Sequence, residues 1–226
     1  MPLPPPANPG PAVDAADAPR LALRRRLLAE REQFAAGPGA QAAQASLSAH
    51  VARLLTEIEP EQLGIYWPVR GEFNPIAALD AAALPKLPLA LPYAQRQPPA
   101  MHYRAWDGQA PAGADECGLP APGNGPAVVP DVVLVPCVGY TPSGFRLGYG
   151  GGYFDRTLAA ACPRPLAVGV GTESACLPTI HPQPHDIPMD FIVTEAGIRA
   201  VEGGTLAAVD PAAAAALAAG IIARRG

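Results

Sequence analysis

The sequence predicts a single α/β domain with a mostly parallel, doubly wound (Rossmann-like) sheet flanked by helices. Strand-like apolar runs alternate with helical stretches, a pattern typical of parallel sheets covered by helices on both faces. The length of 226 residues suits one domain of ordinary size. The most strand-like run, DVVLVPCVGY at 131–140, is apolar nearly throughout, as expected of a strand buried on both faces.

The first predicted helix covers residues 18–34 and carries a strip of arginines. Leu23, Leu27 and Phe34 fall on one side at the helical period, and they form the expected apolar face. The adjacent strip holds Arg20, Arg24 and Arg31. The arginines therefore share one side of the helix.

Three further helices are expected. An amphipathic helix runs from Leu47 to Ile58, and Asn74 caps a short helix opened by Pro75. Near the end, Asp210 caps an Ala-rich helix that Pro211 opens and that ends close to residues 224–225.

Five shorter runs complete the expected strands. Their apolar and β-branched content, with turn residues at their ends, indicates buried strands at 63–69, 87–94, 101–106, 165–171 and 190–197. A Gly- and Pro-rich connection at 107–130 is the only plausible internal linker.

Composition divides the chain into three parts. Residues 1–19 are rich in Pro and Ala and are expected to form a disordered tail. Residues 20–200 are expected to form the α/β domain, and residues 201–226 a C-terminal extension that contains the Ala-rich helix.

Charge and hydropathy favour a small-molecule partner. The net charge of −4 gives no basic field for nucleic acid. The start of the chain has no signal-peptide pattern and no run is long enough to span a membrane, so we expect a cytoplasmic protein, a monomer or weak homodimer. The four cysteines have no metal-ligand spacing and are expected to be reduced.

A glycine-rich stretch, RLGYGGGYFDR at 146–156, follows a strand and precedes a helix. Bare glycines expose backbone N–H groups and the helix adds its positive end, so this loop suits phosphate. It matches neither the Walker loop nor the dinucleotide fingerprint. On spacing alone, a phosphate site and a tight, close-packed turn stay equally open.

The stretch LVPCVGYTPSGFRLGYGGGYFDR resembles the signature of the 5-formyltetrahydrofolate cyclo-ligase (methenyltetrahydrofolate synthetase) family. The resemblance extends from Arg20 to about Gly197, through IYWPVRGEFN and HDIPMDFIVTE. It implies a ligase that uses ATP and Mg²⁺ to convert 5-formyltetrahydrofolate, its folate substrate, to 5,10-methenyltetrahydrofolate, with release of ADP and phosphate.

The resemblance also implies roles for individual residues. The catalytic set is Arg146, Asp155 and Glu72. The ATP-binding set is Arg20, Arg24, Arg146, Leu147, Gly148, Tyr149, Gly150, Gly151, Gly152, Tyr153 and Phe154. The folate-binding set is Trp67, Glu72, Tyr149, Gly150, Gly151, Gly152 and Tyr153.

Asp155 and Asp186 are the implied Mg²⁺ ligands, because this ion takes few protein carboxylates beside phosphate oxygens. Each residue also has a plainer interpretation. Arg20 and Arg24 suit a solvated helix face, Glu72 a surface loop, Trp67 a core position and Asp155 the first turn of a helix. We expect Asp190 to be structural, and His181 and His185 to be exposed.

Two departures from the family pattern leave alternatives open. Tyr140 and Thr141 stand where the family often has an aromatic residue followed by Asp, and GTESACLP lacks an expected Gln. A divergent member that acts on another formyl- or amide-bearing molecule is one alternative. A non-catalytic nucleotide-binding protein is another, which the retention of Glu72, Asp155 and Asp186 together disfavours.

Overall fold

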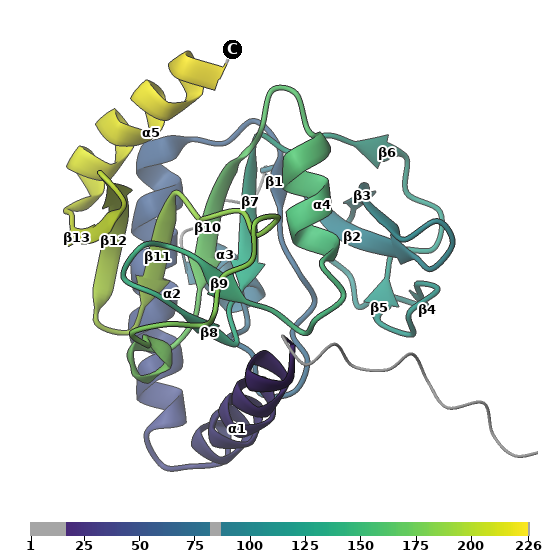
Figure 1. Cartoon of the computed structure of the whole chain (residues 1–226). Helices are drawn as coiled ribbons and strands as arrows, with labels where there is room; N and C mark the ends of the chain where they lie inside the picture. Colours follow the sequence, from purple (N-terminus) through teal and green to yellow (C-terminus); the bar gives the residue numbers. More distant parts are fainter. Residues whose placement is uncertain (1–16, 82–86, 226) are drawn as a thin grey trace, which may run out of the picture.

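The computed structural model of the chain describes residues 17–81 and 87–225 (Figure 1). Its helices are α1 (Ala18–Ala35), α2 (Ala40–Ile58), α3 (Ile76–Ala81), α4 (Tyr153–Ala160) and α5 (Pro211–Arg225). Residues 1–16 of the expected tail lie outside the described residues, and Ala18 and Pro19 belong to α1 rather than to the tail.

A nine-stranded sheet forms the centre of the fold, in the order β13-β12-β11-β10-β7-β1-β2-β3-β6. Its strands are β1 (Leu63–Gly64), β2 (Leu89–Gln95), β3 (Ala100–Trp106), β6 (Ala127–Val128), β7 (Val132–Pro136), β10 (Leu166–Val170), β11 (Phe191–Thr194), β12 (Gly197–Glu202) and β13 (Thr205–Ala208).

The middle of the sheet is parallel and its two edges are antiparallel. Strands β11, β10, β7, β1 and β2 run parallel, with Val132 of β7 in register with Leu63 and Leu166. The parallel centre confirms the α/β prediction. The edge strands turn back because their connections are short: Gly203 and Gly204, both at positive φ, join β12 to β13.

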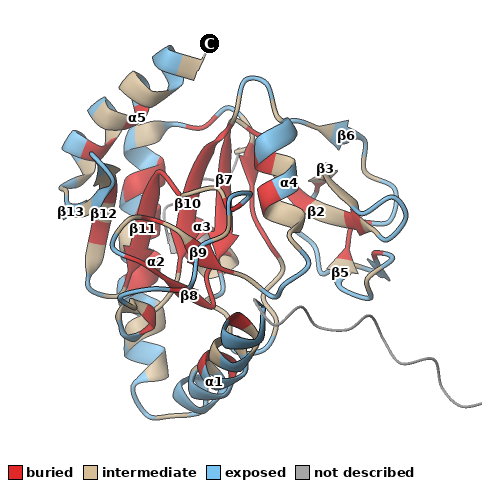
Figure 2. Cartoon of the chain, in the orientation of Figure 1, coloured by how far each residue is buried: buried red, intermediate tan, exposed pale blue. Residues whose placement is uncertain are grey.

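Helices cover both faces of this sheet, as a doubly wound fold requires. Val132 and Leu134 of β7 pack in one apolar cluster with α2, α3 and α5, whereas Val133 and Val135 pack in another with Leu158 of α4. Figure 2 shows the buried residues concentrated in the central strands between these helices. Among the helices of the described residues, none has both the length and the apolar character needed to cross a membrane.

Helix α1 lies near one end of the sheet rather than flat on a face (Figure 1). Its residues Leu27 and Leu28 are buried in a third cluster with Val138, Leu147 and Ile180. Val138 precedes, and Leu147 belongs to, the small ladder of β8 (Gly139–Tyr140) and β9 (Arg146–Leu147), which extends beyond the end of β7. The helix therefore packs beside the carboxyl ends of the parallel strands.

The predicted strands are correct in position, and three of them are wrong in length. The run predicted at 190–197 holds β11, a turn at 195–196 and the first residue of β12. Of the run predicted at 63–69, only Leu63–Gly64 joins the ladder, because the chain then leaves the sheet to build the loop that carries Glu72. The run predicted at 131–140 divides into β7 and β8. After β7 ends at Pro136, the N–H of Val138 donates to the carbonyl of Leu147 in β9.

The connection at 107–130 is not the free linker that its composition predicts. It contains β4 (Gly113–Ala114) and β5 (Pro120–Ala121), which pair with each other, and β6, which pairs with β3. Asp115 fixes this segment by accepting hydrogen bonds from the backbone N–H groups of Ala94, Cys117 and Leu119. The segment therefore extends the sheet edge.

The C-terminal segment completes one face of the sheet. Ala214 and Ala218 of α5 are fully buried in the cluster that contains α2. Arg225 at the end of α5 forms an ion pair with Asp190, whose carboxylate also accepts the N–H of Ala167. This pairing confirms Asp190 as a structural residue.

Candidate active site

The glycine loop, residues 148–152, follows β9 and leads into α4 near the carboxyl ends of the parallel strands. Gly150 and Gly152 have φ of +100° and +62°, which a residue with a Cβ adopts only under strain. A Cβ at Gly150 would also lie 3.3 Å from Cζ of Arg24. These glycines are therefore required by backbone conformation and by a close arginine.

Two arginines hold the carbonyl groups of this loop. Arg24 Nε of α1 donates to the Gly148 carbonyl at 2.7 Å, and Arg156 Nη2 of α4 donates to the Gly151 carbonyl at 2.7 Å. Within the part of the chain that the structure describes, no group accepts a hydrogen bond from the N–H groups of residues 149–152. Free amides at the start of a helix form an environment suited to an anion.

Arg146 and Asp155 form a buried ion pair at the base of the loop. Arg146 Nη2 lies 2.9 Å from Asp155 Oδ2, and Oδ1 of the same carboxylate accepts the N–H of Ile187 at 3.2 Å. Arg146 is 5% exposed, and its Nε lacks a hydrogen-bond partner among the described residues. An unpaired buried donor of this kind is unusual and indicates a place for an acceptor.

A second buried ion pair joins α1 to the segment before β11. Arg20 Nη1 lies 2.6 Å from Asp186 Oδ2 and donates to the carbonyl of His181 at 2.8 Å. Asp186 also accepts the N–H of Gln183 at 2.8 Å. The segment is thereby fixed against α1, while His181 and His185 are exposed as expected.

The two candidate metal ligands are thus already paired with arginines. Asp155 contacts Arg146, and Asp186 contacts Arg20. In residues 17–81 and 87–225, no three His, Cys, Asp or Glu side chains gather closely enough to hold a metal ion. The donors fit an ion that needs only one or two carboxylates and takes phosphate oxygens as further ligands, not an ion held by protein groups alone.

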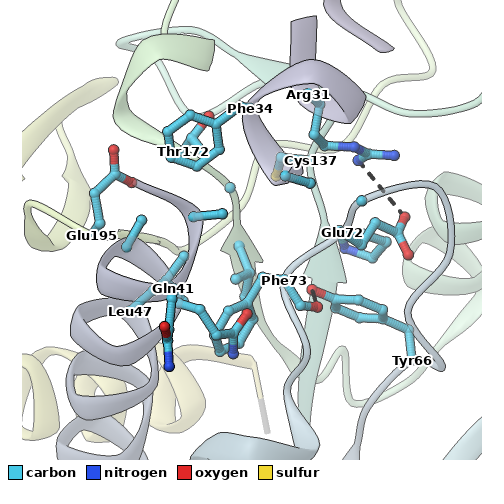
Figure 3. Close-up of a pocket in the computed structure, with 18 residues that line it drawn as sticks. Arg31, Phe34, Gln41, Leu47, Tyr66, Glu72, Phe73, Cys137, Thr172 and Glu195 are labelled. Atoms are coloured by element: carbon cyan, nitrogen blue, oxygen red, sulfur yellow. Dashed lines mark hydrogen bonds and ion pairs between the residues drawn. The ribbon is translucent and has the colours of Figure 1, made fainter. Parts of the chain in front are cut away.

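A pocket of about 290 Å³ lies at the carboxyl ends of β7 and β10 (Figure 3). It lies among α1, α2, the loop that carries Glu72, and the ends of β7 and β10. Its apolar wall includes Phe34, Leu47, Phe73 and Cys137, and in Figure 3 Glu72 and Glu195 stand on opposite sides of it. A hollow that combines an apolar wall with polar side chains suits a small molecule that has both kinds of surface.

Glu72 is held from three directions. Its Oε1 accepts the Tyr149 hydroxyl at 2.6 Å, its Oε2 accepts the Val69 N–H at 2.8 Å, and Arg31 Nη1 lies 3.8 Å from Oε1. Burial raises the pKa of Glu72 above its ordinary value, while the hydrogen bonds and Arg31 oppose that rise. The carboxylate is 3% exposed and has a fixed orientation.

Arg31 is the site residue that sequence reasoning did not assign. Its guanidinium donates to the Tyr149 hydroxyl and to the carbonyl of Arg70, and its Cζ lies 5.5 Å from the centre of the Tyr149 ring. The available signal was the arginine strip of α1, on which Arg31 follows Arg20 and Arg24.

The remaining predicted residues occupy different surroundings. Tyr153 donates to the carbonyl of Gln95 and lies 3.1 Å from the Cys117 thiol, whereas Leu147 is fully buried and Phe154 lies against Arg146. The ring of Trp67 packs edge-on against Trp106, with centroids 6.2 Å apart, and Trp67 does not line the pocket described above. Its ligand role stays a prediction.

The two departures from the family pattern also differ in position. Thr141 is buried, and its hydroxyl is paired with Ser143 at 2.9 Å, away from the pocket lining. Thr172, at the start of the segment without the expected Gln, does line the pocket. The second departure is therefore the one that touches this pocket.

Comparisons with known proteins agree on one family. A model of the 5-formyltetrahydrofolate cyclo-ligase family matches residues 16–195. A curated 5-formyltetrahydrofolate cyclo-ligase from Mycolicibacterium smegmatis is 34% identical over 131 residues, which are 53% of this chain and 57% of that protein. The aligned part thus spans a little over half the length of the curated relative.

Solved structures show the same fold. The NMR structure of a 5,10-methenyltetrahydrofolate synthetase from Aquifex aeolicus gives a TM-score of 0.64 at 26% identity, over 84% of this chain and 96% of that one. A synthetase of the same name from Mycoplasma pneumoniae gives 0.61 at 17% identity, over 78% and 98%. The chain belongs to the 5-formyltetrahydrofolate cyclo-ligase family.

Proposed function

We propose that the protein is a 5-formyltetrahydrofolate cyclo-ligase that uses ATP and Mg²⁺ to form 5,10-methenyltetrahydrofolate, ADP and phosphate. One observation carries the proposal: Tyr149 of the glycine loop is hydrogen-bonded to Glu72 of the pocket. The glycine loop, which would bind phosphate, is therefore joined to the pocket through this residue pair, as a reaction between a nucleotide and a second substrate requires.

The loop and the α1 arginines would bind the triphosphate. The free N–H groups of residues 149–152 and the unpaired Nε of Arg146 support this role. Arg20 and Arg24 approach the same region from α1, and phosphate oxygens would compete for the guanidinium groups that now contact Asp186 and Gly148. Arginines suit phosphate because their planar donors match its oxygens.

Asp155 and Asp186 would hold Mg²⁺, directly or through water, together with phosphate oxygens of the nucleotide. Both carboxylates lie in the same part of the site, since Asp155 accepts the N–H of Ile187, the residue after Asp186. When bound, the ion would supply neutralisation of charge on the phosphates. When no ion is bound, Arg146 and Arg20 balance the negative charge of the two carboxylates.

Glu72 would orient the folate substrate within the pocket. A carboxylate that is buried and fixed by three partners can accept hydrogen bonds from the N–H groups of a pterin ring, while the apolar wall covers the ring faces. Tyr153 and Tyr149 would complete the wall toward the loop. Trp67 would offer a further apolar surface only if ligand binding brought its ring toward the pocket.

The chemistry needs no protein nucleophile. A formamide oxygen is a poor leaving group, so the substrate's formyl oxygen would first attack the γ-phosphorus and displace ADP. The neighbouring folate nitrogen then attacks the formyl carbon, loses its proton, and phosphate departs with the original formyl oxygen. The residues of this chain contribute positioning and charge stabilisation, which dominate catalysis of phosphoryl transfer.

An isotope experiment tests this route. 5-Formyltetrahydrofolate labelled with ¹⁸O in the formyl group, incubated with the protein, ATP and Mg²⁺, should give phosphate that contains the label. Unlabelled phosphate, formed together with the methenyl product, would show that the oxygen leaves by another route. Phosphate released without folate would indicate simple ATP hydrolysis.

Thr172 at the pocket wall favours one second candidate, a cyclo-ligase-like reaction on another formyl- or amide-bearing molecule. Competition assays with such compounds would separate the two. We further propose a cytoplasmic enzyme, a monomer or weak homodimer, whose partner is the small-molecule folate rather than nucleic acid or membrane. Its four cysteines are all free, as suits a reducing compartment.

A further inference from the structure

The arginine strip of α1 reaches both halves of the site. Arg20 contacts Asp186 and Arg24 contacts the Gly148 carbonyl, both on the proposed phosphate side. Arg31, farther along the same helix, contacts Tyr149 and Glu72 on the pocket side. The proposed function assigns work to the first two arginines and none to the third.

Arg31, Tyr149 and Glu72 form a continuous hydrogen-bonded bridge. The Tyr149 hydroxyl accepts from Arg31 Nη2 and donates to Glu72 Oε1. Figure 3 shows Arg31 and Glu72 facing each other at one side of the pocket. The bridge connects three parts of the chain: α1, the glycine loop and the loop after β1.

We propose that Arg31 is a positioning residue for the proposed reaction: acting through Tyr149, it fixes the Glu72 carboxylate at the pocket wall and links it to the glycine loop. The inference rests on the proposed function, because it assigns the bridge a role in binding the folate substrate. Arg31 would touch Glu72 and Tyr149 rather than the reacting atoms.

Arg31 supplies the positive charge that faces the Glu72 carboxylate. Tyr149 and the Val69 N–H donate to the carboxylate, and the Tyr66 hydroxyl and Cys137 thiol are the other titratable groups near it. The side chain of Arg31 is 10% exposed, so water screens its charge only weakly. Without this cation, the buried carboxylate would gain a proton at higher pH.

Steady-state kinetics of three variants test the role. Arg31→Met should raise KM for 5-formyltetrahydrofolate on the order of tenfold, the loss expected for a hydrogen-bonded charged partner, and leave KM for ATP nearly unchanged. The acid limb of kcat/KM for the folate should move to higher pH. Arg31→Lys should recover most of the affinity, since it restores the charge.

Tyr149→Phe is the third variant and disrupts the site least, because the Tyr149 side chain is partly exposed and the substitution keeps the ring. It should weaken folate binding in the same direction. Because both residues act through one bridge, Arg31→Met and Tyr149→Phe together should cost clearly less than the product of the single effects. The matched control is Arg26→Met, on the same helix, whose exposed partner is Glu30.

A ligand-free measurement separates failure of the bridge from failure of the proposed function. The Glu72 carboxyl signal in ¹³C NMR, identified by its loss in Glu72→Gln, should titrate at higher pH in Arg31→Met than in wild type or Arg26→Met. This shift without any folate turnover would support the bridge and reject the cyclo-ligase. An unshifted titration, or equal losses for ATP and folate, would overturn the role of Arg31.

Discussion

Arg20 of α1 and Asp186 of the segment before β11 lie 2.6 Å apart although 166 positions separate them in the chain. Their side chains are 9% and 4% exposed, so the pair is nearly removed from water. A buried charge without its partner is costly, and this pair therefore fixes α1 against the segment before β11.

Asp186→Asn should lower both stability and turnover. It leaves Arg20 buried with a weaker partner, so the free energy of unfolding should fall by up to about 3 kcal/mol, measured by urea denaturation. Saturating MgATP should raise the free energy of unfolding of wild type, and should raise that of the variant less, because Asp186 is a proposed metal ligand.

The matched control is Asp190→Asn, which breaks the ion pair with Arg225 of α5. This variant should lose stability while its KM for ATP stays within about twofold of wild type, a change too small to reflect a lost contact. If Asp190→Asn and Asp186→Asn changed KM for ATP equally, the distinction between a structural and a site carboxylate would be lost.

Asp155→Ala should reduce kcat on the order of 10²-fold, the usual cost of removing one group that stabilises a transition state. It removes a proposed metal ligand and also releases Arg146, whose Nη2 it holds at 2.9 Å. Initial rates at saturating Mg²⁺ measure the effect, with circular dichroism to confirm folding. Turnover near that of wild type would remove Asp155 from the catalytic set.

Glu72→Gln should weaken folate binding and leave ATP binding intact, which isothermal titration calorimetry can measure for each ligand. It should also raise the melting temperature at pH 7. Burial raises the pKa of Glu72, so the folded state holds the proton more tightly than the unfolded chain, and stability falls as pH rises above the unfolded pKa.

Glutamine carries no such penalty, so the stability difference between Glu72→Gln and wild type should shrink below the unfolded glutamate pKa of about 4.3. Calorimetric melts at pH 4 and pH 7 give the comparison. A variant that is less stable at pH 7 than wild type would mean that Arg31 and Tyr149 outweigh the cost of burial. Equal loss of ATP and folate affinity would contradict the folate assignment.

Gly150→Ala should impair nucleotide binding at least tenfold. The new Cβ would sit 3.3 Å from the Arg24 guanidinium, which must move slightly, and φ +100° strains the backbone of any residue that has a Cβ. Gly108→Ala is the control, since Gly108 has φ +84° and a Cβ added there would meet no heavy atom within 4 Å. The control should lose about 1 kcal/mol of stability and keep its affinity for ATP. If Gly108→Ala weakened ATP binding as much as Gly150→Ala does, backbone strain alone would explain the loss, and the glycine loop would have no special role in binding ATP.

Sequence patterns predicted the elements of this fold well where hydrophobic periodicity was strong. Helix α1 was placed to within a residue, and β10 at Leu166–Val170 lies inside the predicted run at 165–171. Periodicity does not report pairing direction, so the antiparallel edges at β3 and β12 were not predicted. Those edges follow from short connections that only antiparallel neighbours accept.

The role of the glycine loop is predicted from its resemblance to a family signature, whereas the partners of the loop depend on contacts between distant segments. Nothing local to Arg31 indicates that it reaches Tyr149, 118 positions away. Likewise, Asp155 and Asp186 were identified by resemblance as metal ligands, and their present arginine partners could be seen only in the folded chain.

The most direct test of the proposed cyclo-ligase activity is formation of the methenyl product by the purified protein. 5-Formyltetrahydrofolate and Mg²⁺, with and without ATP, are followed by the near-ultraviolet absorbance of 5,10-methenyltetrahydrofolate. We expect a rise in absorbance that requires ATP and that is strongly reduced in Glu72→Gln at limiting folate. No rise in wild type, with the fold intact and ATP bound, would contradict it.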